Sequence, residues 1–202
     1  MADAKMVAEL RDKTGAGMMA CKKALTEAGD DIVKAVEILK KMGAMKAAQK
    51  TAERTTAEGI IVTYLHHNKK LASMLELQCE SDFVARNEDC VAFANDLAMQ
   101  VAAMAPEYVS PDSIPEADVE KQKQVFVQEI AEDKKPDDIK AKIVQGKLDK
   151  WMQDVCLTKQ AFFKDEDKTV EQLLTEKIAT IGEKIVIARF ARWELGKSAS
   201  SC

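Results

Sequence analysis

Apolar residues in the first 42 positions recur every three or four residues, and this spacing predicts three short helices. Each predicted helix ends close to a glycine: the first at residues 14–17, the second at Gly29 and the third at Gly43. Glycine favours such ends because it adopts the left-handed backbone found there. We therefore expect a three-helix bundle with a thin core over residues 1–43. An Ala- and Lys-rich linker, helical in part, follows over residues 44–57.

The period of the pattern changes near Gly59. Residues 59–67 are mostly β-branched or apolar, and apolar side chains alternate with other residues over 71–78, which together predict a β-hairpin. A further β-branched run, residues 185–193, predicts a third strand, since an isolated hairpin is only marginally stable in water. We expect these three strands to form one antiparallel sheet.

Helical spacing returns between the hairpin and the third strand. One helix is predicted at about residues 84–104, two more pass through Phe126 and Trp151, and a fourth begins after a capping-box pattern at residues 169–172. The elements together predict an α+β fold. Its core, over residues 58–196, is a three-stranded antiparallel sheet packed with several helices, and a Ser-rich flexible tail of residues 197–202 follows.

Composition narrows the class of protein. The 202 residues carry a net charge of −4, and carboxylates are interleaved with the lysines, which argues against a nucleic-acid partner. No apolar run reaches the length of a membrane span, and the N-terminus has neither a secretory signal pattern nor an Arg-rich transit pattern. We therefore expect a cytoplasmic protein that binds neither nucleic acid nor membrane.

The titratable residues do not converge on an enzyme site. His66 and His67 would point to opposite faces of a strand, so we expect exposed residues at the end of the hairpin. The acidic run at residues 165–167 lacks the spaced oxygen ligands of a calcium loop and is expected to form a solvated turn. We predict no catalytic residue, no metal site and no cofactor.

The cysteines form no C-x-x-C pair, so neither a zinc ribbon nor a thioredoxin motif is supported; they are Cys21, Cys79, Cys90, Cys156 and Cys202. Most are expected to be reduced and at least partly buried. An enzyme that uses Cys79 or Cys90 with a histidine remains an alternative, although no base with an orienting partner accompanies them.

Two places in the chain suggest contact with another protein. Met18 and Met19 begin the second helix, where one face cannot bury both; they form either a docking surface or one core and one incidental residue. Asp82 and Phe83 lie where a strand ends and a helix begins. Either this pair projects into a partner, or Ser81 or Asp82 caps a helix and Phe83 packs beneath it.

Two motifs carry a resemblance to a known family. Residues 10–25, LRDKTGAGMMACKKAL, closely resemble the N-terminal signature of bacterial translation elongation factor Ts, and residues 79–84, CESDFV, resemble its second signature. There Ser81 replaces the usual threonine and keeps a hydroxyl. Later segments at 135–147 and 157–163 resemble the core of the family, so the resemblance covers nearly the whole chain.

The resemblance implies guanine-nucleotide exchange on elongation factor Tu, without active-site chemistry in this chain. Leu10, Met18 and Met19 match the positions through which the bundle, built like a ubiquitin-associated (UBA) domain, docks on the GTPase. Asp82 and Phe83, between Ser81 and Val84, match the group that intrudes near the partner's bound magnesium.

The chain also resembles the short form of the family, because it passes directly from residues 92–94 into 97–106 without a second core subdomain. This likeness implies a homodimer in which the second copy replaces the missing subdomain. The alternative is a binding module for a different partner, since a bundle of this kind serves many partners.

Overall fold

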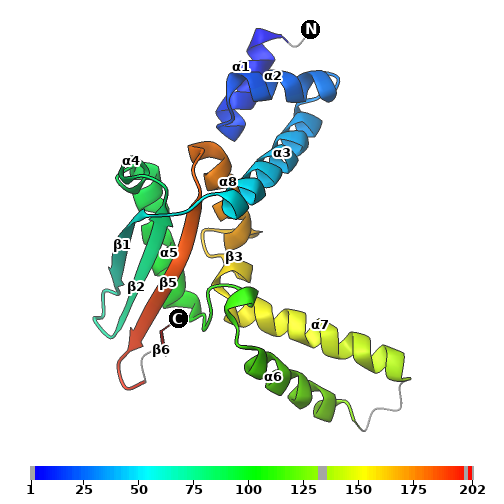
Figure 1. Ribbon diagram of the computed structural model, residues 1–202, viewed down its shortest axis with the longest axis vertical. Helices are drawn as coiled ribbons and strands as arrows, with labels where there is room; N and C mark the ends of the chain where they lie inside the picture. The colour runs from blue at the N-terminus through cyan, green and yellow to red at the C-terminus, as the bar shows by residue number, and fades with distance from the viewer. Residues whose placement is uncertain (1–2, 132–135, 198–199, 202) are drawn as a thin grey trace. The chain divides into compact units, whose positions relative to one another are not determined.

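The computed structural model describes residues 3–131, 136–197 and 200–201 (Figure 1). The chain forms two compact units, each of them built from three separate stretches of sequence. The first unit contains Met1–Ile60, Leu77–Val91 and Gln172–Val186, and the second contains Ile61–Glu76, Ala92–Glu171 and Ile187–Cys202.

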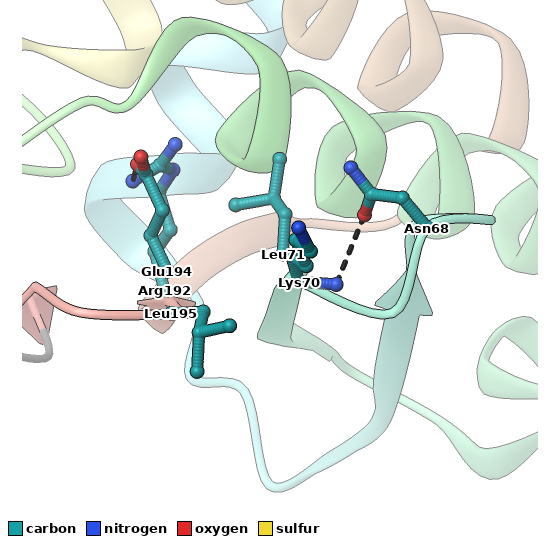
Figure 2. Close-up of a pocket in the computed structure, with 6 residues that line it drawn as sticks. All are labelled: Asn68, Lys70, Leu71, Arg192, Glu194 and Leu195. Carbon is teal, nitrogen blue, oxygen red and sulfur yellow. Dashed lines mark hydrogen bonds and ion pairs between the residues drawn. The ribbon is translucent and has the colours of Figure 1, made fainter.

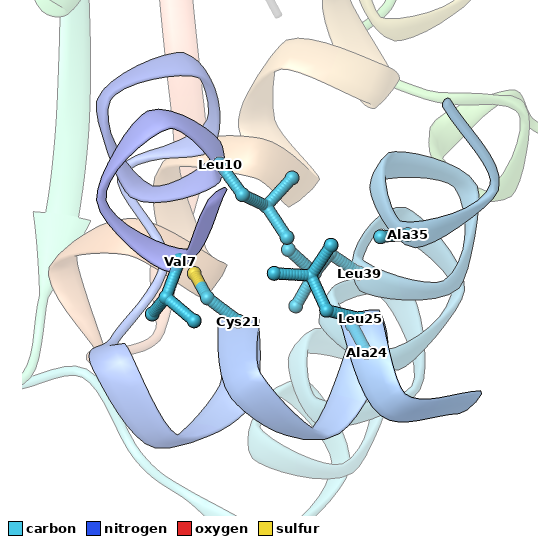
Figure 3. Packing of buried hydrophobic residues seen from close by; sticks show 7 residues of the cluster. All are labelled: Val7, Leu10, Cys21, Ala24, Leu25, Ala35 and Leu39. Atoms are coloured by element: carbon cyan, nitrogen blue, oxygen red, sulfur yellow. The ribbon is translucent and has the colours of Figure 1, made fainter. Parts of the chain in front are cut away.

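The N-terminal helices of the first unit are α1 (Ala4–Thr14), α2 (Met18–Glu27) and α3 (Ile32–Glu53). Asp31 caps α3, because its carboxylate accepts hydrogen bonds from the backbone N–H groups of Val33 and Lys34 at 2.9 and 3.2 Å. Gly15 ends α1 with a left-handed backbone, φ 66°. Side chains from all three helices form one apolar cluster (Figure 3): Val7, Leu10, Cys21, Ala24, Leu25, Ala35 and Leu39.

The predicted end of the third helix at Gly43 is wrong, because α3 continues to Glu53. A Cβ atom at residue 43 would lie 3.1 Å from the Cβ of Ala179 in α8 (Val170–Ile181). Gly43 therefore permits a close approach between two helices and does not stop one. Most of the predicted linker is helical, and only residues 54–57 join α3 to the sheet without helix or strand.

The predicted three-stranded antiparallel sheet is confirmed. Its strands are β1 (Glu58–Leu65), β2 (Leu71–Cys79) and β5 (Ile185–Glu194), and the strand order is β1-β2-β5-β6. The added strand β6 is Ser200–Ser201, which pairs with Ala191 and Arg192. It lies within the predicted flexible tail; Cys202, from the same tail, lies outside the described residues.

The second unit contains further helices besides its part of the sheet (Figure 1). They are α5 (Glu88–Met104, from residue 92 on), α6 (Glu116–Glu129) and α7 (Asp137–Val155), with short 3₁₀ turns η1 (Pro111–Ser113) and η2 (Leu157–Lys159). The Ser73 hydroxyl of β2 donates to the Ala98 carbonyl of α5 at 2.6 Å. The paired helices α6 and α7 enclose a small cluster of Ile130, Val144 and Leu148.

Two further local predictions are corrected. The acidic run 165–167 is not a turn: it begins β4 (Asp165–Thr169), which pairs with β3 (Ala161–Phe162) in a small second sheet. His66 and His67 do lie at the end of the hairpin, but β1 ends at Leu65, so the two residues do not alternate across a strand. Their ring centroids are 4.2 Å apart.

In the part of the chain that the structure describes, no helix combines the length and the apolar character needed to cross a bilayer.

Candidate partner-binding site

Phe83 is the most exposed large apolar residue that the structure describes, with 84% of its surface accessible to solvent. It belongs to a one-turn helix, α4 (Asp82–Ala85). The next two residues, Val84 and Ala85, are buried at 9% and 5%. The turn therefore packs on its Val84 side and presents its phenyl ring outward, and the alternative that Phe83 packs beneath a helix is wrong.

The turn exists because the predicted helix at 84–104 is divided. Asn87 interrupts it: its side-chain oxygen accepts hydrogen bonds from the N–H groups of Asp89 at 2.8 Å and Cys90 at 3.4 Å, which starts α5 afresh. The Asn87 N–H in turn donates to the Val84 carbonyl at 3.1 Å, which closes α4. We call residues 81–87 the Phe83 turn.

Ser81 holds the base of the Phe83 turn. Its backbone N–H donates to Glu183 Oε2 at 3.1 Å, and its hydroxyl donates to Glu183 Oε1 at 2.7 Å. Its carbonyl accepts from the Ala85 N–H at 3.2 Å and from the Cys79 thiol at 3.1 Å. Ser81 precedes α4 at the N-cap position, yet its hydroxyl makes no cap bond, because Glu183 takes it.

A second carboxylate, Glu80, ties the same base to two other segments. It accepts from the Lys184 N–H at 2.5 Å and from the Arg54 guanidinium at 2.9 and 3.1 Å. Partial burial alone would raise the pKa of Glu80, but the Lys184 hydrogen bond and the Arg54 charge together hold that pKa below its ordinary value. Glu80 is therefore ionised at neutral pH and acts as a fixed anionic clamp.

Asp82 offers the charged part of the turn. Its carboxylate lies 3.3 Å from the Arg86 guanidinium one helical turn later; the Arg86 side chain is 81% exposed and the Asp82 side chain 46% exposed. Such an exposed pair contributes little stability. The carboxylate can therefore exchange this partner for another at little cost.

The thiols beneath the turn are poor nucleophiles. Cys79 and Cys90 are both buried. Burial raises the pKa of Cys79, helped by the nearby Glu183 carboxylate, and burial with the nearby Cys79 raises the pKa of Cys90 to about 11. Nucleophilic thiolate is therefore scarce at neutral pH, which argues against the enzyme alternative. Among the described residues, no three His, Cys, Asp or Glu side chains are grouped to hold a metal ion.

The second exposed group lies on the bundle. Met18 and Met19 are 51% and 77% exposed, so neither is a core residue. Leu10 differs: it is completely buried in the cluster of Figure 3, and its side chain supports this surface from within the bundle. Val33 and Met45 of α3 are also exposed, and the sequence analysis did not single them out.

A shallow hollow at the far end of the hairpin is a weaker candidate (Figure 2). Asn68, Lys70, Leu71, Arg192, Glu194 and Leu195 line it. Its one carboxylate is already paired, because Glu194 lies 2.9 Å from Arg192 and 2.8 Å from Lys197. The hydrogen bonds from Lys197 and Arg192 lower the pKa of Glu194. We assign no ligand to this hollow.

Glu183 is the site residue that the sequence analysis missed. It lies 102 positions after Ser81, in the short connection between α8 and β5, and no local pattern marks it.

Anchored apolar groups of this kind, on a small α+β frame, define a protein that acts through contact with another macromolecule. A sequence model of the family "Elongation factor TS" matches residues 4–197. Elongation factor Ts of Thermosipho melanesiensis is 48% identical over 197 residues, which cover 98% of this chain and 100% of that protein. Elongation factor Ts of Acetivibrio thermocellus is 49% identical over the same share of this chain and 91% of its own length. The chain belongs to the elongation factor Ts family.

Proposed function

We propose that this protein is a guanine-nucleotide exchange factor for elongation factor Tu and acts in the cytoplasm. The observation that carries the proposal is the Phe83 ring, 84% exposed on a turn whose base is hydrogen-bonded to Glu183. Ser81, Asp82, Phe83 and Val84 form the group that acts on the GTPase, with Phe83 and Asp82 facing the partner and Ser81 and Val84 holding them.

The exchange mechanism follows from linkage. Magnesium bridges the nucleotide phosphates to a GTPase, so a partner that disturbs the metal site weakens nucleotide binding. An exchange factor must bind the nucleotide-free GTPase more tightly than the nucleotide-bound one. By linkage, the factor lowers the affinity of the GTPase for nucleotide by the same ratio as the nucleotide lowers its affinity for the factor. Burying one phenyl ring is worth about 1.5–3 kcal/mol. If the GTPase pocket that receives the ring opens only when the metal site is distorted, the ring alone shifts the equilibrium towards the distorted metal site by about one to two decades.

The bundle supplies affinity in this proposal. Met18 and Met19 are flexible thioethers that adapt to an uneven surface, and they already face solvent. Leu10 acts indirectly, because its burial fixes α1 against α2 and α3. The chain itself performs no covalent chemistry and needs no cofactor.

We also propose that the second partner is another copy of this chain. The sheet in the second unit exposes Ile61 and Leu65 from β1, Met74 from β2 and Trp193 from β5. A second copy is the proposed cover, because the chain resembles the short form of the family, in which a second copy stands in for a missing core subdomain. Light scattering at micromolar concentration should give twice the chain mass of 22.3 kDa, and a monomer there would refute the dimer.

Release of labelled GDP from elongation factor Tu tests the exchange activity directly. Catalytic amounts of this protein should accelerate release in the presence of excess unlabelled nucleotide, and an unrelated Ras-type GTPase should not respond. Unchanged release from elongation factor Tu would refute the function. Capture of a different partner from a lysate would then favour the alternative, a binding module of another specificity.

A further inference from the structure

Glu183 stands out among the residues around the Phe83 turn because it satisfies two donors of a single residue. Its two carboxylate oxygens accept the backbone N–H and the hydroxyl of Ser81 at 3.1 and 2.7 Å. We propose that Glu183 is the positioning residue of the exchange site, which it serves by fixing the direction in which Phe83 projects. The inference rests on the proposed function, which it deepens.

The turn needs such a tether because it is too short to be rigid alone. A single helical turn fixes several dihedral angles for few hydrogen bonds, so its formation is unfavourable without outside support. Within α4 the supporting backbone bonds are those from Ala85 to Ser81 at 3.2 Å and from Arg86 to Asp82 at 3.1 Å. Their acceptors, the carbonyls of Ser81 and Asp82, lie at the end that Glu183 holds. Charge-assisted hydrogen bonds to a carboxylate are about twice as strong as neutral ones.

The neighbouring residue extends the tether to a third segment. The Lys184 N–H donates to Glu80, and the Lys184 ammonium group donates to the Arg54 carbonyl at 2.7 Å. Two successive residues of the α8–β5 connection thus hold residues 80 and 81 and the end of α3. The base of the turn is fixed at three points of the first unit.

A fixed direction matters for exchange because binding energy distorts a partner only if the inserted group does not yield first. A ring that swings on a loose turn would find a position on the undistorted GTPase and lose its preference for the empty state. Loss of the tether should therefore lower the maximal exchange rate more than it weakens association, since the bundle docks separately.

The first experiment needs no partner. Amide hydrogen exchange should accelerate at least tenfold at Ala85, Arg86 and Asn87 in Glu183→Ala and in Ser81→Ala, while the amides of α5 from Phe93 onward stay unchanged. The matched control is Asp96→Ala, which removes a carboxylate bound to Lys164 at 2.6 Å and should leave these three amides unchanged.

The second experiment measures GDP release from elongation factor Tu at varied concentrations of the GTPase–GDP complex. In Glu183→Ala the kcat should fall about tenfold, the effect of one charge-assisted hydrogen bond, with KM within about twofold. Asp96→Ala is the control and should retain wild-type kcat, because its carboxylate binds Lys164 and not the Phe83 turn. The kcat of the double variant Ser81→Ala/Glu183→Ala should lie within about twofold of the kcat of each single variant, because the two residues act as one unit.

The outcomes separate the two proposals. Wild-type protein that fails to release GDP refutes the exchange function, whatever the amide data show. Active wild-type protein with unchanged kcat in both Glu183→Ala and Ser81→Ala refutes the positioning role, as does a tenfold loss that also occurs in Asp96→Ala. If Glu183→Ala does not fold, Ser81→Ala decides the question, since it leaves the carboxylate in place.

Discussion

The Phe83 turn and the Met18–Met19 pair of the bundle both expose large apolar side chains, yet they are supported in different ways. Phe83 stands on a turn whose base is held by Glu183, Glu80 and a buried Val84. Met18 and Met19 begin α2 behind Gly17, which makes no side-chain cap bond. A rigid ring suits the distortion of a partner, whereas flexible thioethers suit adaptable docking. In the proposed exchange mechanism, support more than exposure would separate the group that distorts the partner from the group that docks on it.

The largest effect is expected where the docking surface depends on its core. Leu10→Ala should destabilise the bundle by about 2–5 kcal/mol, because it leaves a cavity in a small apolar cluster, in which Leu10 is completely buried. Urea unfolding followed by circular dichroism measures this loss. The exposed Val33→Ala, on the same bundle, is the control and should change stability by less than about 0.5 kcal/mol. Equal effects of the two changes would refute the role of Leu10 as support.

The next effect separates action from attachment. Phe83→Ala should keep the fold but raise the barrier to GDP release by about 1.5–3 kcal/mol, the value of burying the ring. Stopped-flow release of a fluorescent GDP analogue gives kcat and KM, and kcat should carry most of the loss. Met45→Ala, equally apolar and 74% exposed, is the matched control and should release GDP at the normal rate. Normal release by Phe83→Ala would end its assignment.

The methionine pair should show the complementary pattern. The double variant Met18→Ala/Met19→Ala should weaken association with elongation factor Tu by about 1–2 kcal/mol, because both side chains are truncated and their adaptable apolar contacts are lost. The weaker association should raise KM and leave kcat nearly unchanged. Calorimetric titration of the nucleotide-free GTPase checks the binding loss. A fall in kcat alone would erase the distinction between the two regions.

The smallest effect is acidic weakening of the Phe83 turn. The pKa of Glu80 is lowered in the folded protein, so its clamp adds stability above the ordinary value of 4.5 and loses it as the pH falls through the folded pKa. The difference in unfolding free energy between wild type and Glu80→Gln should therefore be largest at neutral pH and shrink below about pH 4.5. A difference that grows in acid would contradict the clamp.

The Asp31 carboxylate, which caps α3 in the bundle, should also lose its stabilising effect as the pH falls. Hydrogen bonding to the Lys34 backbone lowers the pKa of Asp31, so acid weakens both regions and does not favour one.

Elements with a strong period could be predicted from the sequence, and their exceptions have physical causes. The hairpin, the helix at 170–181 and the third strand follow directly from alternation and helical spacing. The helix end predicted at Gly43 was wrong, because a glycine that ends a helix and a glycine that allows a neighbouring helix to approach closely look alike in sequence. The strands β3 and β4 are short and charged, so no apolar period announces them.

The sequence shows the residues of the proposed site but not the contacts that support them. The sequence placed Asp82 and Phe83 together at an element boundary and placed both methionines at a helix start. It could not show that Phe83 faces outward, because that depends on Asn87 restarting the helix and on Val84 packing inward. Glu183 was invisible, since hydrogen bonds across 102 residues leave no spacing to read.

The Ser81–Glu183 contact would also limit how far the proposed exchange activity can be transferred to a smaller molecule. A synthetic peptide that copies residues 79–87 would contain the ring and the acid but not the distant carboxylate that orients them. Such a peptide should be a poor mimic or inhibitor at the GTPase, and a useful one would need a staple or crosslink in place of Glu183. For the same reason, transplanting this short motif onto another scaffold requires an acceptor placed opposite the serine.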